Sequence, residues 1–356
     1  MATAHAVFHP LRVARIEPLT DDAVALTFEL PDDLRADYTF APGQHLTIRC
    51  DDGVRRSYSL CTPASSGVLR VGIKRLPGGA FSGAVLDRLR PGDELDVMTP
   101  SGRFGPVLDA AHRLRYAAVA AGSGITPVLS IVASLLEAEP ESSVTLVYAN
   151  RTAGSVMFLD EVHDLKDRWP DRLQIVHVFS REAGESELLS GRLDADRMKR
   201  LLGSLVPAEM VDQWFLCGPQ AMVEELSAAL LEHGVDAAAV HTELFHADPV
   251  VRAPAPAPEG AVEGAAEVTI TLDGRTSTFP LHGAGVPVLE AALAVRPDAP
   301  FACRGGVCGT CRARVVEGSA VMDTNWALEP GEVERGYVLT CQSHPTSERL
   351  VLDYDA

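Results

Sequence analysis

Four cysteines near the C-terminal end of this 356-residue chain have the spacing C-x4-C-x2-C-x29-C: Cys303, Cys308, Cys311 and Cys341. Thiolates at this spacing are the ligands of a plant-type [2Fe–2S] cluster. Gly305, Gly306 and Gly309 lie between the first three cysteines. The absence of a Cβ at these positions lets backbone amides turn toward cluster sulfurs. We therefore expect a loop that wraps an iron–sulfur cluster and a chain that carries electrons singly.

Two other uses of these cysteines remain open. Cys308 and Cys311 form a C-x2-C pair, but zinc ribbons usually add a second such pair or a histidine pair. Here the next cysteines stand alone, one five residues upstream and one far downstream. Disulfides are disfavoured, because the chain opens without the basic and apolar segments of a secretion signal, so we expect a reducing cytoplasmic location.

Length and charge limit the classes of protein that fit. The chain is long enough for two or three domains, each with its own core. A net charge of −18 opposes binding to nucleic acid or anionic membranes and favours a partner with a basic patch. The longest apolar candidate is interrupted by Gly122, Ser123, Gly124 and Pro127, so we expect no membrane span and a soluble protein.

The first 105 residues alternate apolar and polar side chains in short runs with Pro-Gly or Asp-Gly turns between them. The runs are Val24–Leu30, His45–Cys50, Val68–Ile73 and Glu94–Met98. This pattern predicts an antiparallel β-barrel as the first domain.

After Phe104 the pattern changes. We expect a strand over Tyr116–Ala120, a Gly-rich turn, a helix over Val128–Glu137 and a strand over Val144–Tyr148. A strand, glycine turn, helix and strand in this order predict a doubly wound α/β domain, here over residues 106–246.

Residues 247–266 are rich in Pro and Ala and show neither helical nor strand periodicity. Such a composition is typical of a semi-stiff linker, although an extended segment packed on the surface also fits. The cysteine-bearing segment 267–356 would then be a third domain.

Arg56, Ser57, Tyr58 and Ser59 form an R-x-Y-S sequence on an expected barrel strand. It resembles the flavin signature of the ferredoxin–NADP reductase superfamily. The chain resembles this superfamily over roughly residues 1–246, fused to a plant-type ferredoxin of α+β, β-grasp fold at 267–356. The resemblance implies that Arg56 pairs with the FAD pyrophosphate, Tyr58 lies on the isoalloxazine and the Ser59 hydroxyl lies near flavin N5.

A Gly-Gly turn follows Lys74 and leads into an expected helix over Ser82–Leu89. Free amides at a helix N-terminus accept phosphate, and the resemblance places the FAD pyrophosphate there. The FAD-binding candidates in this segment are Lys74, Gly79, Ala80, Phe81 and Ser82. An ordinary hairpin turn with a capping serine is the plainer interpretation.

The dinucleotide candidates are Gly122, Gly124 and Thr126, in a turn that follows an apolar strand and opens a helix. Glycines there let the backbone approach dinucleotide phosphates. Cys217 and Gly218 follow an expected strand over Gln213–Leu216 and precede an expected helix over Ala221–Leu231. The resemblance implies that Cys217 faces the nicotinamide, whereas a small buried thiol is the alternative.

The segment His241-Thr242-Glu243-Leu244-Phe245 is similar to the E-x-aromatic ending of the family's nicotinamide domain. The resemblance implies that Glu243 joins a hydrogen-bond chain near flavin N5 and that Phe245 covers the ring face opposite Tyr58. Ser59, Cys217 and Glu243 are thus the candidate catalytic residues. Plant-type reductases end at a Tyr here, whereas this chain has Phe and continues.

Ser180 and Arg181 follow an apolar strand over Leu173–Phe179 and match the S-R-E with which plant-type reductases hold the 2′-phosphate of NADP. A guanidinium beside a hydroxyl suits a phosphate dianion. Arg151, after the preceding strand, could add a second charge. We therefore expect NADPH as the donor, while solvated loop arginines remain the alternative.

The domain order and the stretch from Gly336 to Pro345 resemble the reductase subunits of phenylacetyl-CoA epoxygenase complexes. The resemblance implies transfer from NADPH through FAD and the cluster to a di-iron oxygenase of a multicomponent system. Three alternatives remain: a reductase for a Rieske-type or ketosteroid hydroxylase, a non-enzymatic redox sensor, and a zinc-bound interaction module. Arg304 and Arg312, beside the cysteines, could raise the cluster potential or serve docking.

Overall fold

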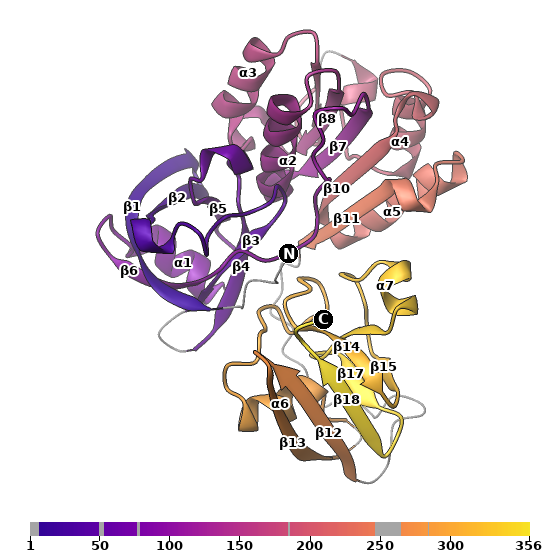
Figure 1. The fold of residues 1–356 in the computed structure, drawn as a ribbon. Helices are drawn as coiled ribbons and strands as arrows, with labels where there is room; N and C mark the ends of the chain where they lie inside the picture. Colours follow the sequence, from indigo (N-terminus) through magenta and orange to yellow (C-terminus); the bar gives the residue numbers. More distant parts are fainter. Residues whose placement is uncertain (1–6, 50–52, 77–78, 184–185, 246–264, 284) are drawn as a thin grey trace. The chain divides into compact units, whose positions relative to one another are not determined.

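The structure is a computed structural model that describes residues 7–49, 53–76, 79–183, 186–245, 265–283 and 285–356. It divides into two compact units (Figure 1). The larger unit contains the described residues of 8–52 and 58–247. The smaller unit is built on the described residues from 265 onward and includes Gly53–Ser57.

The first part of the chain folds into an antiparallel sheet. Its strands are β1 (Phe8–Thr20), β2 (Ala23–Glu29), β3 (His45–Arg49), β4 (Arg55–Ser59), β5 (Arg70–Lys74) and β6 (Glu94–Met98). They lie in the order β4-β3-β6-β1-β2-β5. An isolated antiparallel bridge between Leu60 and Val71 brings the chain after β4 to the other edge strand, which curls the sheet into a barrel.

Apolar side chains that alternate along these strands fill the interior of the barrel, as the period of a half-buried strand requires. Leu26, Ile48 and Val71 are fully buried there, and helix α1 (Ala80–Asp87) adds Phe81 and Val85. The helix expected over Ser82–Leu89 therefore starts and ends two residues earlier. Ser82 lies inside the helix because its hydroxyl accepts the Leu76 amide (3.1 Å) across the preceding turn.

The second part is a parallel sheet covered by helices on both faces. Its strands are β7 (Arg115–Ala121), β8 (Ser143–Asn150), β9 (Leu173–Phe179), β10 (Gln213–Pro219) and β11 (Val240–Phe245), in the order β11-β10-β7-β8-β9. Helices α2 (Ile125–Ala138) and α3 (Leu159–Arg168) cover one face, and α4 (Ala195–Leu202) and α5 (Gln220–Glu232) cover the other (Figure 1). The strand order reverses between β7 and β10, which is where such sheets bind ligands.

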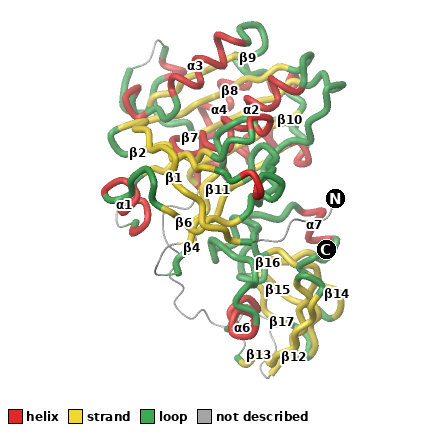
Figure 2. Tube along the Cα trace, turned by 60° about the vertical axis from the view of Figure 1, so that its left-hand side comes forward, coloured by secondary structure: helices red, strands yellow, loops and turns green. Residues whose placement is uncertain are grey.

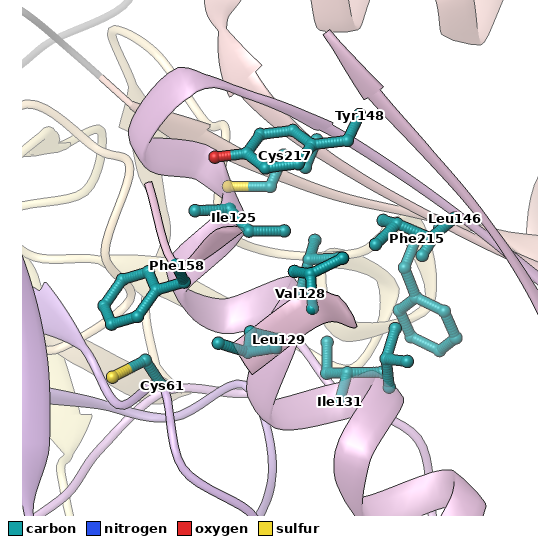
Figure 3. Close-up of a cluster of buried hydrophobic side chains, with 14 of the residues drawn as sticks. Cys61, Ile125, Val128, Leu129, Ile131, Leu146, Tyr148, Phe158, Phe215 and Cys217 are labelled. Atoms are coloured by element: carbon teal, nitrogen blue, oxygen red, sulfur yellow. The ribbon is translucent and has the colours of Figure 1, made fainter. Parts of the chain in front are cut away.

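The core of this sheet is continuous with the barrel. Its cluster of buried side chains includes Ile125, Phe158 and Cys217 (Figure 3), and also Ala25 and Cys61 from the barrel segment. Two boundaries differ from the expectation. Helix α2 begins at Ile125, directly after a 3-10 turn over Gly122–Gly124. Strand β10 extends to Pro219, so Cys217 lies within the strand rather than after it.

The C-terminal domain is a mixed sheet with short helices. Its main sheet contains β12 (Ala265–Leu272), β13 (Arg275–His282), β14 (Arg312–Glu317), β16 (Tyr337–Leu339) and β18 (Arg349–Asp353), ordered β13-β12-β18-β14-β16. Strands β15 (Ala320–Met322) and β17 (Ser343–Pro345) pair separately, and the helices are α6 (Val288–Val295) and α7 (Pro330–Glu334) (Figure 2). The core gathers Val268, Ile270 and Leu352 under α6.

The expected fold class is confirmed: an antiparallel barrel, a parallel α/β domain and an α+β cluster domain. Most of the linker expected over residues 247–266 lies outside the described residues, and its last two residues belong to β12. None of the helices in the described chain combines the length and apolarity that a membrane crossing requires.

Candidate functional site

Three candidate residues from distant parts of the chain meet in the larger unit. The Ser59 hydroxyl at the end of β4 donates to Oε2 of Glu243 in β11 (3.3 Å). The same oxygen lies 3.9 Å from Sγ of Cys217 in β10. Ser59 and Cys217 are buried, and the structure therefore forms one Ser–Glu–Cys group from a barrel strand and two strands of the parallel sheet.

Strand register and close backbone packing produce this meeting. Cys217 and Glu243 are register partners in the parallel pair β10 and β11, so their side chains project from neighbouring positions. The 3-10 turn before α2 packs on the same place, because a Cβ on Gly124 would overlap the carbonyl oxygen of Cys217. Only glycine fits there, and the loop before α2 is thereby held against Cys217.

Burial sets the charge of this group. It raises the pKa of Glu243 to about 8, although hydrogen bonds from Ser59 and Cys217 oppose the shift. Burial also raises the pKa of the Cys217 thiol well above its ordinary value, with a further contribution from the Glu243 charge. The thiol is therefore neutral at physiological pH, and the carboxyl can hold or release a proton near neutrality.

The flavin candidates lie along β4 and at the start of α1. Tyr58 packs near Phe81, with 5.6 Å between ring centroids, so the two aromatic candidates are neighbours. Arg56 is partly exposed. Gly79 precedes Ala80, where α1 begins, and a Cβ on Gly79 would meet the Ser82 hydroxyl. An arginine, a tyrosine and a helix N-terminus on one barrel are a donor set that suits a flavin dinucleotide.

Lys74 differs from the other flavin candidates. Its Nζ forms an ion pair with Asp22 (3.3 Å), between the ends of β5 and β2. The Lys74 ammonium therefore already has a carboxylate partner, and a flavin phosphate would have to compete with Asp22 for it.

The dinucleotide candidates surround the same switch point of the parallel sheet. Gly122 has φ +53°, with open space where a Cβ would stand. The Thr126 hydroxyl donates to the Ser123 carbonyl (3.0 Å) and fixes the turn. Gly218 packs against Ala121 and Met222. Phe245 is partly buried at the end of β11 and packs against the core.

The phosphate candidates are brought together by the backbone. The Arg181 amide donates to the Arg151 carbonyl (2.8 Å), and the Ser180 amide donates to the Asn150 carbonyl (2.9 Å). Ser180 and both arginines are exposed, and neither guanidinium forms an ion pair with any other described residue. The loops after β8 and β9 thus present two guanidinium groups and a hydroxyl to solvent on one edge.

In the smaller unit the four cysteines are connected by pairwise contacts. The Cys303 thiol is within hydrogen-bonding contact of Cys308 and Cys341, and Cys341 also contacts Cys311. Cys311 and Cys341 are buried and the other two are half-buried. Four adjacent thiols are the donor set of a [2Fe–2S] cluster, in which each iron takes two of them. These contacts are pairwise: among the described residues, no three potential ligands converge as they would on a single metal ion.

Backbone geometry around Cys303 also fits a cluster. The Gly305 amide donates to Cys303 Sγ (3.3 Å), and the Val307 amide contacts the same sulfur. Gly306 and Gly309 have φ +76° and +67°, as expected for a loop that turns its amides inward. Arg304, with φ +55°, also takes the left-handed conformation in this loop.

Sequence reasoning missed Gln342. Its buried side-chain amide donates to the Arg304 carbonyl (2.8 Å) and lies 3.5 Å from Cys341 Sγ, so it links the cysteine loop to the last cysteine. The only signal was its position beside Cys341. A glutamine there could equally have been exposed.

The two arginines beside the cysteines have different surroundings. Arg312 donates to Glu332 (2.9 Å) and to the Ala356 carbonyl (3.2 Å), and its guanidinium stacks 4.0 Å from the Tyr337 ring. Arg304 is exposed and pairs with Glu290 at 3.3 Å. Arg312 is therefore committed to the domain's own packing, whereas Arg304 lies at its surface.

Comparison with known proteins agrees with this layout. Three family models match consecutive segments: an oxidoreductase FAD-binding domain over residues 10–105, an oxidoreductase NAD-binding domain over 118–228 and a 2Fe-2S iron-sulfur cluster binding domain over 270–346. The chain is 42% identical to one component of the 1,2-phenylacetyl-CoA epoxidase of Escherichia coli (strain K12), over 98% of each protein. It belongs to the same family of oxygenase reductases.

Further similarities extend this result. The chain is 35% identical to the ferredoxin reductase component of the 3-ketosteroid-9-alpha-monooxygenase of Mycobacterium tuberculosis, over 97% of this chain and 95% of that protein. The solved structure of phthalate dioxygenase reductase matches with a TM-score of 0.58 at 24% identity, over 97% of this chain and 98% of that one, and shows the shared fold.

The predicted class of activity is confirmed. The protein is an electron-transfer oxidoreductase with domains for FAD, a nicotinamide dinucleotide and a [2Fe–2S] cluster. Its relatives are reductase components of oxygenase systems, so an oxygenase component is the class of partner expected for it. Together the three groups can accept a two-electron hydride and release single electrons.

Proposed function

We propose that this reductase uses NADPH to supply electrons to a di-iron oxygenase that epoxidises the ring of phenylacetyl-CoA. The observation that supports it most directly is the 42% identity to a 1,2-phenylacetyl-CoA epoxidase component over 98% of both proteins. That span includes all three domains, so the donor side, the cluster and the surface that meets the oxygenase are compared together.

The flavin and nicotinamide candidates take the following roles in this proposal. Tyr58 and Phe245 cover the two faces of the flavin ring, and Arg56 with the start of α1 holds its pyrophosphate. Cys217 positions the nicotinamide, next to the turn that Gly124 holds in place. Glu243, linked to Ser59, holds or releases the proton at the reacting end of the flavin.

Ser180, Arg181 and Arg151 bind the 2′-phosphate of NADPH. Their support is the backbone pairing that sets the two exposed arginines side by side with no acidic partner among the described residues. A dianion placed there gains charge-assisted hydrogen bonds that a bare ribose does not.

Cys303, Cys308, Cys311 and Cys341 hold the cluster, and the domains are divided at about residues 105, 246 and 266. We also propose a cytoplasmic location, because thiolate ligands are kept from forming disulfides in a reducing compartment.

The decisive experiment mixes the purified protein with the di-iron oxygenase, oxygen, NADPH and phenylacetyl-CoA. The proposal predicts that NADPH and phenylacetyl-CoA disappear in step. The matched control omits the oxygenase, and substrate should then persist. Absent or uncoupled turnover, in a preparation whose flavin is reduced by NADPH, would contradict the partner assignment.

A reductase for a Rieske-type or ketosteroid hydroxylase is the second candidate, because of the 35% identity to a 3-ketosteroid-9-alpha-monooxygenase component. It predicts brisk turnover with that oxygenase in the same assay and little with the di-iron enzyme.

A further inference from the structure

A single arginine side chain joins the barrel to the parallel sheet. Arg70, in β5, directs one guanidinium nitrogen to Glu161 of α3 (2.8 Å) and another to Glu17 of barrel strand β1 (3.4 Å). Its charged end also lies 5.2 Å from the centroid of the Phe158 ring. The arginine side chain is 15% exposed, whereas those of Glu161 and Glu17 are 34% and 40% exposed, so the ionic contacts are partly shielded from water.

The surrounding contacts are tight. Phe158 is buried at the N-terminus of α3 with φ +56°, a conformation that a bulky residue adopts only when its surroundings impose it. A Cβ on Gly72, two residues after Arg70, would collide with the Phe158 ring and with the side chain of Thr126. The barrel strand therefore approaches both α3 and the first turn of α2 as closely as a backbone can.

The same junction continues along α2. The Ser130 hydroxyl donates to the Thr62 carbonyl (2.7 Å), and the Ser134 hydroxyl accepts the Ala64 amide (3.0 Å). Both serines are buried and lie one turn apart on the face of α2 that meets the barrel. Figure 3 shows Cys61 and Phe158 beside the α2 side chains Ile125 and Leu129, in the cluster that also contains Cys217.

We propose that Arg70 is a positioning residue for hydride transfer, which it supports by holding the barrel and the parallel sheet at the separation that brings Ser59 to Glu243 and Cys217. The inference rests on the proposed nicotinamide site. Ser59 is carried by the barrel, whereas its two partners are carried by β11 and β10. The geometry of the group thus depends on how the two sheets are fixed together.

The link from Arg70 to the site runs through α3 and α2. Arg70 fixes the first turn of α3 through Glu161, and Phe158 at that turn packs with Ile125 of α2 in one cluster. The turn before α2 touches the Cys217 carbonyl through Gly124. A small rotation of the barrel about this junction would separate Ser59 from Glu243, and a displacement of about 1 Å can lower a rate by roughly a hundredfold.

The test measures flavin reduction by NADPH in the full-length protein with its FAD and cluster. In Arg70→Ala the limiting rate constant at saturating NADPH should fall about tenfold to a hundredfold, with NADPH affinity within about threefold of wild type and FAD retained. Arg70→Lys, which keeps one ionic contact, should recover part of the rate. A purely structural role would instead lower FAD content or thermal stability and leave the limiting rate of the loaded protein unchanged.

Arg49→Ala is the matched control. Arg49 pairs with Asp96 (2.9 Å) and stacks on Phe8 (4.5 Å), which is the same chemistry confined to the barrel, and the variant should react like wild type. Glu161→Gln removes the negative charge on the α3 side of the same ion pair. If Arg70→Ala does not fold, the limiting rate of flavin reduction in Glu161→Gln tests the positioning role instead. A wild-type limiting rate in Glu161→Gln and in every Arg70 variant that folds would overturn the inference.

Cys217→Ala separates this inference from the proposed function. A slow Cys217→Ala with normal Arg70 and Glu161 variants would overturn only the positioning role. A normal rate in Cys217→Ala would overturn the proposed nicotinamide site and, with it, the inference that depends on the site.

Discussion

The two candidate redox sites of this protein are built in opposite ways. Three of the four cluster cysteines fall within nine residues, and the loop that carries them has its shape from left-handed backbone at Arg304, Gly306 and Gly309. The Ser59–Glu243–Cys217 group instead joins three strands. Its hydrogen bond from Ser59 to Glu243 links residues that are 184 positions apart in the sequence. One site is a property of a loop, whereas the other is a property of how two sheets pack.

This difference determines which changes each site tolerates. A loop site depends on its own backbone and its ligands, so distant substitutions should leave it intact. A site assembled from two sheets depends also on how those sheets pack, for example where Gly124 meets the Cys217 carbonyl and where Arg70 lies in the sheet junction. Substitutions at either site test this contrast.

The largest effect should come from Cys303→Ser. It removes a ligand from the local site, so iron and acid-labile sulfide should be lost and electron delivery to a protein acceptor should cease. FAD content and flavin reduction by NADPH should persist, because the assembled site lies in the other compact unit. Metal analysis measures the loss of the cluster, and the visible spectrum with and without NADPH measures the retention and reduction of FAD.

The control is Cys61→Ser, which changes a buried thiol outside the cluster and should keep two irons per chain. If Cys303→Ser also lost its FAD, the two sites would not be independent and the comparison would fail.

The same contrast explains what sequence reasoning could reach. The cysteine spacing alone pointed to the cluster ligands, because their positions in the chain and in space nearly coincide. The meeting of Ser59 with Glu243 followed only from a family resemblance, since no local pattern relates residues so far apart. No sequence pattern pointed to Arg70. A single arginine on a barrel strand predicts nothing about the junction, and only the structure shows that α3 packs against it.

Gly124→Ala should strongly impair the assembled site. The added methyl group would overlap the Cys217 carbonyl, and such overpacking typically costs about 1–3 kcal/mol. We expect the limiting rate of flavin reduction to fall roughly tenfold or more, because the nicotinamide side of the group is displaced. Stopped-flow absorbance and thermal unfolding measure the two effects.

Gly154→Ala is the matched control, since open space surrounds the added methyl and no left-handed φ is involved. Equal behaviour of the two variants would mean that the close approach at Cys217 does not govern the site.

Arg181→Ala should affect cofactor choice by a smaller factor. Loss of a charge-assisted contact to a phosphate costs about 1.5–3 kcal/mol, which corresponds to roughly tenfold or more in kcat/KM for NADPH. The value for NADH should barely change, because a bare ribose gains little from the guanidinium. Steady-state kinetics with both donors provide the measurement.

Arg168→Ala, at the end of α3, controls for the loss of one positive charge from the same domain. A wild-type protein that uses NADH and NADPH equally well would remove the basis for this assignment.

The smallest effect concerns pH and the carboxyl of Glu243, a half-buried residue of the assembled site. Burial raises the pKa of Glu243 from an ordinary value near 4.5 to about 8. Below pH 4.5 the carboxyl is protonated in both folded and unfolded protein, so its ionisation costs nothing. Between pH 4.5 and 8 only the unfolded chain releases the proton, and the folded state loses stability as the pH rises, until the penalty is complete above about 8.

The side chain in Glu243→Gln cannot titrate. The free energy of unfolding of this variant should therefore increase relative to that of wild type between pH 4.5 and 8, and the difference should stay constant above pH 8. The limiting rate of flavin reduction in wild type should change with a midpoint near pH 8, and this step should be absent from Glu243→Gln. Glu224→Gln, on the exposed side of α5, should keep the wild-type pH profile. Chemical denaturation and stopped-flow series across pH 5–9 measure both quantities. Identical pH profiles for wild type and Glu243→Gln would mean that the carboxyl is not held in the buried contact with Ser59, and the assembled site would lose its central member.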